Sequence, residues 1–232
     1  MLNHGKHKAF MLKILTSIFQ SPIKDSLAFK GGTLAFLCYG LPRFSTDIDL
    51  DLLDHTREKE VVDVLQDILE DIGEIKNMTL GKALHRWIFR YDESAMNIKV
   101  EINKRSLDGN RYERKKIENT DVYCMSQSSM VANKMVALYD RAYSRDLFDV
   151  HYFLAQNFIC DDEIIELRTD LNKYQLFQAL IEEIPDYFHS NTVLAGLGEL
   201  LTDQQKMWVK SQLVSDTIRL LQNYLDQKSS QS

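Results

Sequence analysis

The most regular pattern in the chain is an alternation of acidic and aliphatic residues between positions 47 and 52. Acids occupy positions 47, 49 and 51, and Ile48, Leu50 and Leu52 lie between them. Successive side chains of a β-strand point to opposite faces, so the alternation predicts a strand with one apolar and one acidic face. We expect the apolar face to pack on the core and the acidic face to line a site.

A glycine pair precedes this strand by about fifteen residues. The order of apolar and turn-forming residues predicts a short strand, a tight turn at Gly31 and Gly32, and then a helix. Thr33 is expected to cap that helix and to present its hydroxyl outward. Helix N-termini favour phosphate, so the three residues predict a phosphate-binding turn. Arg43 and Ser45, in the connecting loop, are candidates to reach the same anionic oxygens.

The acidic face predicts a site for a divalent metal ion. Carboxylates held side by side repel one another unless a cation lies among them, so such a face is costly for stability alone. Oxygen ligands of this kind suit Mg²⁺. Asp47 and Asp49 are therefore candidate ligands of one or two Mg²⁺ ions.

Two other interpretations of the acidic stretch have to be weighed. The spacing of Asp47, Asp49 and Asp51 imitates the start of an EF-hand calcium loop, with Glu58 at its twelfth position. The sixth position of that loop requires glycine, whereas this chain has Leu52. A solvated strand face without any ligand is the second alternative.

The combination of motifs resembles the nucleotidyltransferase superfamily, in which a Gly-Gly turn precedes an Asp-x-Asp metal pair. The fuller string, Gly31-Gly32-Thr33-x-Leu followed by Arg43-Phe-Ser-Thr-Asp-Ile-Asp-Leu50, resembles the AbiEii/AbiGii family. Members of that family are nucleotidyltransferase toxins of bacterial toxin–antitoxin and abortive-infection systems. The resemblance implies an NTP substrate, a cognate antitoxin and an RNA acceptor, with the 3′ end of tRNA as a candidate.

The resemblance also suggests site residues outside the acidic strand. Residues 97–103 alternate again, and if this strand neighbours the first, Glu101 becomes a third carboxylate beside Asp47 and Asp49. Further along, Lys134 on a helix, followed by Asp146 and Asp149, resembles the family's later motifs, a lysine and a downstream aspartate. Lys134 would bind the triphosphate and stabilise charge. Either Asp146 or Asp149 would orient that lysine or act as a base, and the sequence does not separate the two.

The hydrophobic period changes near residue 125. Before it, the pattern predicts helices at 5–20, 33–39 and 56–73, and strands at 27–30, 48–53, 75–79, 84–91, 97–103 and 122–125. The polar, basic segment 106–118 is predicted to be a loop. After residue 125, every segment has a helical period, including 191–201. The fold class expected is α+β, with a mixed sheet flanked by helices in a nucleotidyltransferase domain (1–125) and a C-terminal helical bundle (126–232).

Composition and charge indicate which ligands and which cellular compartment are compatible with the sequence. The 232 residues carry a net charge of −6, but residues 99–116 hold seven cations and three acids, a local charge of +4. Such a segment could bind nucleotide phosphates or an RNA backbone. No apolar run is long enough to span a bilayer, and the N-terminus lacks a signal-peptide core, so neither membrane insertion nor secretion is expected. The three cysteines are widely spaced, which predicts packing roles in a reducing cytoplasm.

Other enzyme classes lack their motifs in this sequence. It contains no Gly-x-Ser-x-Gly, His-Glu-x-x-His or P-loop string. The function expected is therefore Mg²⁺-dependent transfer of a nucleotidyl group from an NTP, with release of pyrophosphate. Two alternatives stay open: a non-catalytic module that binds nucleotide or metal, and a nucleotidyltransferase that modifies a small molecule such as an antibiotic.

Overall fold

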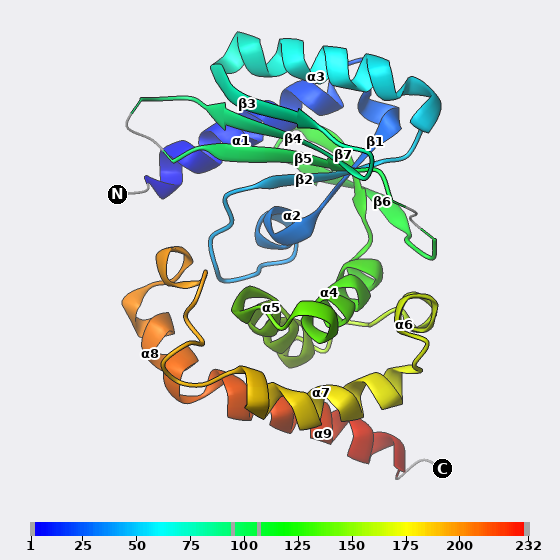
Figure 1. Ribbon diagram of the computed structural model, residues 1–232, viewed down its shortest axis with the longest axis vertical. Helices are drawn as coiled ribbons and strands as arrows, with labels where there is room; N and C mark the ends of the chain where they lie inside the picture. Colours follow the sequence, from blue (N-terminus) through cyan, green and yellow to red (C-terminus); the bar gives the residue numbers. More distant parts are fainter. Residues whose placement is uncertain (1–2, 94–95, 106–107, 230–232) are drawn as a thin grey trace. The chain divides into compact units, whose positions relative to one another are not determined.

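The computed structural model describes residues 3–93, 96–105 and 108–229 (Figure 1). The chain divides into two compact units. The first comprises residues 1–107 and 111–126, and the second comprises residues 108–110 and 127–232. The expectation that each corresponds to a separate domain stays a prediction.

The first unit is built on a mixed sheet of seven strands: β1 (Leu27–Lys30), β2 (Ile48–Leu52), β3 (Glu74–Leu80), β4 (Leu84–Arg90), β5 (Ile98–Asn103), β6 (Tyr112–Ile117) and β7 (Thr120–Met125). Their order across the sheet is β3-β4-β5-β2-β1-β7-β6. β2 runs parallel to β5, β1 runs parallel to β7, and the other neighbouring pairs are antiparallel. The acidic strand β2 is therefore central, between β1 and β5.

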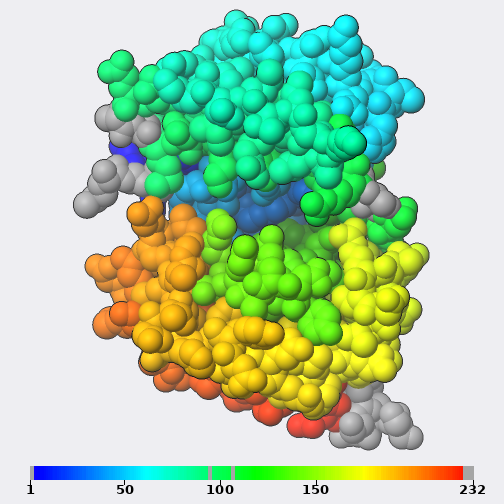
Figure 2. All heavy atoms as spheres, viewed as in Figure 1, coloured from blue at the N-terminus to red at the C-terminus, as the bar shows by residue number. Residues whose placement is uncertain are grey.

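Helices cover both faces of this sheet. α1 (His4–Phe19) and α3 (Glu58–Ile72) pack on one face, and α2 (Gly31–Cys38) lies on the other (Figure 1). Short 3₁₀ turns, η1 (Lys24–Ser26) and η2 (His55–Arg57), lead into β1 and α3. In the space-filling view, α3, β3 and β4 form one continuous outer surface, in cyan and turquoise (Figure 2).

The alternation in β2 has the predicted effect on burial. Ile48, Leu50 and Leu52 are buried on one face of the strand. Asp49 points to the opposite face, where it meets the start of α2, so the aliphatic residues face the layer of α1 and α3. Burying three aliphatic side chains contributes about 1.5–3 kcal/mol each and fixes the register of the strand.

The second unit is helical. It contains α4 (Gln127–Arg141), α5 (Ser144–Ala155), α6 (Asp162–Thr169), α7 (Lys173–Tyr187), η3 (Gly198–Leu200), α8 (Asp203–Ser211) and α9 (Leu213–Ser229). α9 packs against α5 and α7, and α4 packs against α5 and α6. The predicted fold class, α+β with a mixed sheet and C-terminal helices, is confirmed.

Two local predictions are wrong. Residues 112–117 form β6 instead of a loop, because an edge strand that pairs with β7 alone buries little and needs no apolar alternation. Residues 191–201 form turns and the short η3 instead of a helix. Gly196, whose φ is +70°, interrupts the helical backbone there. Within the described residues, no helix is long and apolar enough to cross a membrane.

Candidate active site

The turn between β1 and α2 approaches the acidic strand very closely. Gly31 has a φ of +80°, in the left-handed region that glycine tolerates best. A β-carbon built on Gly31 would lie 2.1 Å from Oδ2 of Asp49. Only glycine leaves room for this carboxylate, so the predicted pairing of the glycine turn with the acidic strand is a direct packing contact.

The hydroxyl of Thr33 points into the protein. Thr33 is fully buried. Its Oγ1 donates to the backbone carbonyl of Asp47 and lies 2.9 Å from Oγ of Ser45. The expected helix cap is wrong, since Lys30 occupies the N-cap position and no side chain caps α2. The hydroxyl instead ties α2 to the backbone of a candidate metal ligand.

Arg43 and Ser45 close the other side of the turn. Both are buried, and Nη1 of Arg43 donates to the carbonyl of Phe44 at 3.1 Å. A β-carbon on Gly32 would lie 2.9 Å from Nη2 of Arg43 and 3.1 Å from Oγ of Ser45. The two residues thus lie close to the glycine turn. Their contact with phosphate stays a prediction.

Four charged residues form a row across the middle of the sheet. Lys30 on β1 is in register with Asp49 on β2, Asp49 with Glu101 on β5, and Glu101 with Arg86 on β4. The expected neighbourhood of Glu101 and Asp49 is therefore present. Glu101 itself accepts from Nε of Arg86 at 2.5 Å.

Carboxylate oxygens are suitable ligands for a hard divalent cation, but the described acids are not gathered around one point. Asp47 precedes β2, and its Oδ2 lies 3.2 Å from Nζ of Lys99. Among the residues that the structure describes, no group of three or more His, Cys, Asp and Glu side chains could hold a metal ion. Asp49 offers a carboxylate beside a turn that a β-carbon would fill, and the role of Asp47 and Asp49 as metal ligands stays a prediction. Glu101 would join them only by leaving or sharing Arg86.

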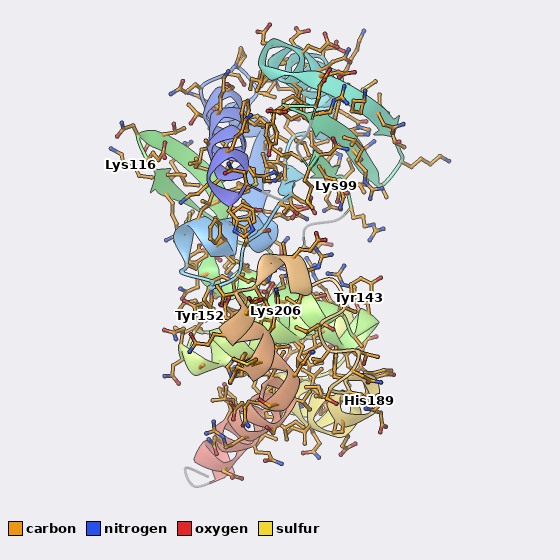
Figure 3. All side chains as sticks on the ribbon, turned by 90° about the vertical axis from the view of Figure 1, so that its left-hand side faces the viewer. Lys99, Lys116, Tyr143, Tyr152, His189 and Lys206 are labelled. Carbon is orange, nitrogen blue, oxygen red and sulfur yellow. The ribbon has the colours of Figure 1, made fainter. Side chains whose placement is uncertain are left out.

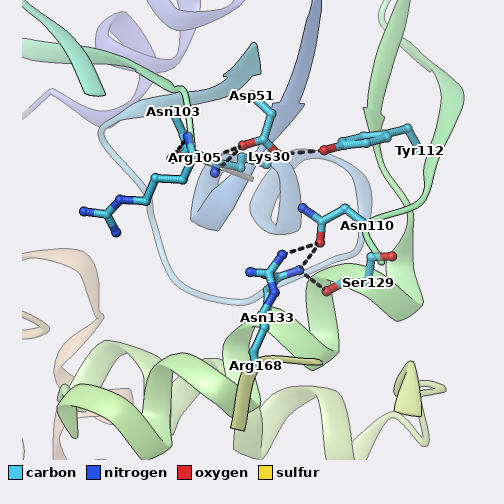
Figure 4. A network of polar contacts seen from close by, with 9 residues as sticks. All are labelled: Lys30, Asp51, Asn103, Arg105, Asn110, Tyr112, Ser129, Asn133 and Arg168. Carbon is cyan, nitrogen blue, oxygen red and sulfur yellow. Dashed lines mark hydrogen bonds and ion pairs between the residues drawn. The ribbon is translucent and has the colours of Figure 1, made fainter. Parts of the chain in front are cut away.

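Asp51, the third acid of the alternation, has a different environment. It is fully buried, and its carboxylate accepts from Nζ of Lys30 at 2.5 Å and from Nδ2 of Asn103 at 2.9 Å. Its Oδ2 also accepts from the hydroxyl of Tyr112 at 3.1 Å (Figure 4). The carboxylate is thus neutralised within the sheet. The acidic pattern alone could not distinguish it from Asp47 and Asp49, because its partners lie on three other strands.

The basic segment 99–116 does not form one patch. Lys99 and Lys116 project on different sides of the first unit (Figure 3). Several of its cations are engaged in ion pairs: Lys99 with Asp47, Lys104 with Glu58, Arg114 with Asp25 and Lys115 with Glu113. Arg105 and Lys116 are exposed. Counting charges along the sequence overstated the positive field that a ligand would meet, because it ignored these partners.

In the second unit, the predicted lysine and both candidate aspartates meet. Nζ of Lys134 on α4 lies 2.8 Å from Oδ1 of Asp146 and 2.8 Å from Oδ2 of Asp149, both on α5. The two aspartates are buried, and 16% of the lysine side chain is exposed. Both acids therefore contact the ammonium, and which of them has the functional role stays a prediction.

Arg141 adds a second cation to this cluster. Its Nε lies 2.8 Å from Oδ2 of Asp146. Burial raises the pKa of Asp146, but the charge of Lys134 and the hydrogen bonds from Arg141 and Lys134 outweigh it, so the net pKa is lowered. Asp146 is thus held as a carboxylate between two cations. Arg141 was not among the residues predicted for the site, because its contact with Asp146 depends on how two different helices meet.

Solved structures show the same fold at low sequence identity. JHP933 from Helicobacter pylori is 17% identical, with 99% of each chain covered and a TM-score of 0.57. MenT4, a nucleotidyltransferase toxin from Mycobacterium tuberculosis, is 18% identical over 94% of this chain and 84% of its own, with a TM-score of 0.58. The antibiotic-resistance factor ANT(2'')-Ia is 12% identical over 80% of this chain and 100% of its own, with a TM-score of 0.50. No curated protein shows significant sequence similarity to the chain.

A family model decides the assignment. The model described as "Nucleotidyl transferase AbiEii toxin, Type IV TA system" matches residues 13–211, which include both the glycine turn with its acidic strand and the Lys134 cluster. The chain therefore belongs to the AbiEii family and is a nucleotidyltransferase toxin of a toxin–antitoxin system.

Proposed function

We propose that this toxin transfers a nucleotidyl group from an NTP to an RNA acceptor, with the 3′ end of tRNA as the leading candidate. Pyrophosphate is the leaving group. The observation that carries the proposal is the contact of the Asp49 carboxylate with Gly31, in register with Glu101. This contact joins a phosphate-binding turn to oxygen ligands suited to Mg²⁺.

Each residue has a distinct task in this scheme. Asp47 and Asp49 hold one or two Mg²⁺ ions, and Glu101 is available as a third ligand. Bound Mg²⁺ supplies a Lewis acid that offsets the charge of the phosphate oxygens. The backbone at Gly31 and Gly32 cradles the triphosphate.

The remaining residues orient these groups. Thr33 fixes the backbone of Asp47 through its hydroxyl, and Arg43 and Ser45 approach the anionic oxygens beside Gly32. In the helical unit, Lys134, whose ammonium two carboxylates orient, is proposed as a cation that binds nucleotide phosphate oxygens. A positive charge fixed in advance stabilises charge in the transition state without reorganisation.

The choice of RNA rests on the family and on the chemistry of the acceptor. The reaction needs a hydroxyl or phosphate as nucleophile, and the 3′ end of an RNA offers free hydroxyls on an accessible single strand. The exposed Arg105 and Lys116 would contact the backbone of such an acceptor. The toxin's cognate antitoxin is proposed to counteract this modification.

A transfer assay tests the proposal. The protein is incubated with each α-³²P-labelled NTP, Mg²⁺ and either total RNA, purified tRNA or an aminoglycoside. We expect label in tRNA, its loss in Asp49→Asn, and its retention in Asp63→Asn, which removes an exposed carboxylate from α3. Label in the aminoglycoside alone would point to a small-molecule enzyme. Nucleotide binding without transfer to any acceptor would point to a non-catalytic module.

A further inference from the structure

The first helix of the sheet unit is basic. α1 carries three lysines and two histidines and no acidic residue, in a chain whose net charge is −6. α3, which packs beside it, carries six acids and one lysine. Among the residues that the structure describes, Lys6 pairs with Asp92, whereas no carboxylate pairs with Lys8 or Lys13. α1 therefore presents positive charge to the solvent that no acid of its own neutralises.

Aromatic rings lie beside one of these cations. The ring of His4 stacks on that of Phe44, with centroids 4.2 Å apart and planes within 5°. Phe36 meets the same ring edge-on at 5.3 Å, and Nζ of Lys8 lies 5.5 Å from the centroid of Phe36. Phe44 is buried, Phe36 is partly exposed, and His4 and Lys8 are exposed. We call these four residues the α1 surface, in which two rings and a cation lie over a buried third ring.

The α1 surface adjoins the candidate active site. Phe44 lies in the loop that leads into β2, three residues before Asp47. The buried ring of His7 packs edge-on against Phe44 at 5.9 Å, and its Nε2 lies 3.0 Å from the carbonyl oxygen of Thr46. A carbonyl oxygen can only accept, so Nε2 donates in this hydrogen bond. The surface is thus tied to the backbone of the residue that precedes Asp47.

Rings and an unneutralised cation are the groups that bind single-stranded nucleic acid. An aromatic face stacks on an unpaired base of any sequence, and a lysine attracts the neighbouring phosphate. His4 is exposed, so a base can stack on the ring face that Phe44 leaves uncovered. The bases of a duplex are stacked on one another, so a duplex offers this surface its phosphates alone. The combination therefore fits an unpaired strand better than a duplex.

We propose that the α1 surface binds the unpaired 3′ nucleotides of the RNA acceptor, with a base stacked on the rings and a phosphate beside Lys8. This inference rests on the proposed function, because it takes RNA as the acceptor. It does not depend on which residues hold a metal ion. His4 and Lys8 precede residue 13, where the match to the family model begins, so that match does not cover them.

Fluorescence anisotropy of labelled tRNA, titrated with the full-length protein, tests the stacking contact. The tRNA is used intact and without its unpaired 3′ nucleotides. We expect His4→Ala and Phe36→Leu each to raise the dissociation constant for intact tRNA about ten-fold, which corresponds to about 1.4 kcal/mol. Binding of the truncated tRNA should change less than about two-fold. His4→Phe is the matched control, because it keeps a ring that can stack and should bind like wild type.

The salt dependence of the same titration tests the charge. Lys8→Gln is expected to reduce the slope of log K against log salt concentration by about 0.7, the value for one phosphate contact on a single strand. Lys13→Gln is the control, since Lys13 is an exposed lysine on a different side of the same helix, and it should keep the wild-type slope. Thermal denaturation shows whether each variant is folded. If Phe36→Leu does not fold, the exposed positions His4 and Lys8 still decide.

Three outcomes would overturn the proposal. Dissociation constants within two-fold of wild type in His4→Ala and Lys8→Gln would mean that the surface does not hold RNA. An equal loss of affinity for intact and truncated tRNA would place the contact on the duplex. A raised KM for the NTP with unchanged affinity for tRNA would assign the rings to the base of the nucleotide substrate. Failure of the proposed function looks different: wild type would transfer label to no RNA, whatever affinities the variants show.

Discussion

The Asp49 carboxylate lies against the backbone of Gly31, at a separation that leaves no room for a β-carbon. This contact connects the two motifs that define the candidate active site. It also makes the site sensitive to changes that are small in volume and alter no charge.

Gly31→Ala tests this sensitivity. The added methyl group would meet Asp49, and the φ of +80° is strained for alanine. Displacing a ligand by about 1 Å costs on the order of 100-fold in rate, so we expect kcat/KM to fall by about that factor or more. Gly198→Ala is the control, because no atom lies within 4 Å of the added carbon. A Gly31→Ala enzyme with wild-type activity would contradict the close contact.

Thr33→Val probes how the turn supports Asp47. Valine has a similar volume but lacks the hydroxyl that bonds Ser45 and the Asp47 carbonyl. Leaving these buried groups unsatisfied is expected to lower the free energy of unfolding by about 1–3 kcal/mol, measured by urea denaturation. Thr79→Val, at an exposed position on β3, should change it by less than about 0.5 kcal/mol.

Arg86→Met asks whether Glu101 is a metal ligand. An ion pair with partial exposure contributes about 0–1 kcal/mol, so releasing Glu101 from Arg86 should tighten Mn²⁺ binding about two- to five-fold. Arg90→Met serves as the control, because Arg90 lies on the same strand as Arg86 but pairs with Glu74. Unchanged affinity in Arg86→Met, together with unchanged affinity in Glu101→Gln, would remove Glu101 from the set of ligands.

Asp146→Asn tests the charged cluster through the pH dependence of stability. The folded pKa of Asp146 is lowered, so its stabilising contribution is present above the unfolded pKa of about 3.9 and is lost as pH falls through the folded pKa. We expect the variant to lose about 3 kcal/mol of unfolding free energy at pH 7. Equilibrium unfolding in urea should show this difference shrinking below about pH 4. A difference that is constant with pH would mean that the charge of Asp146 is not responsible.

Much of the first unit could be predicted because its pattern is local. Alternation in residues 47–52 is a property of one strand, and it specified both the buried face and the acidic face. The glycine turn was recognisable because Gly31 and Gly32 are adjacent. In the second unit, the contact of Lys134 with Asp146 and Asp149 could also be predicted, because these residues lie on two consecutive helices.

What sequence reasoning missed depends on contacts between distant strands. Asp51 was left out of the predicted ligands, but its structural role became visible only with its partners on β1, β5 and β6. The Arg86 contact of Glu101 requires the register of β4 and β5. Thr33 was expected to face outward, but burial against the Asp47 carbonyl reversed its direction. In each case, contacts between segments far apart in the chain decided a role that residue type left open.

Residues 108–110 have a consequence for the design of truncated forms of the toxin. It belongs to the helical unit although the residues on either side belong to the sheet unit, so the polypeptide crosses over three times. Asn110 accepts hydrogen bonds from Asn133 and Arg168, on α4 and α6. A fragment beginning at residue 127 would forfeit that tripeptide and leave both donors without this acceptor. A chimera that exchanges the helical unit between homologous toxins therefore also has to exchange residues 108–110, which precede the main junction at residue 127.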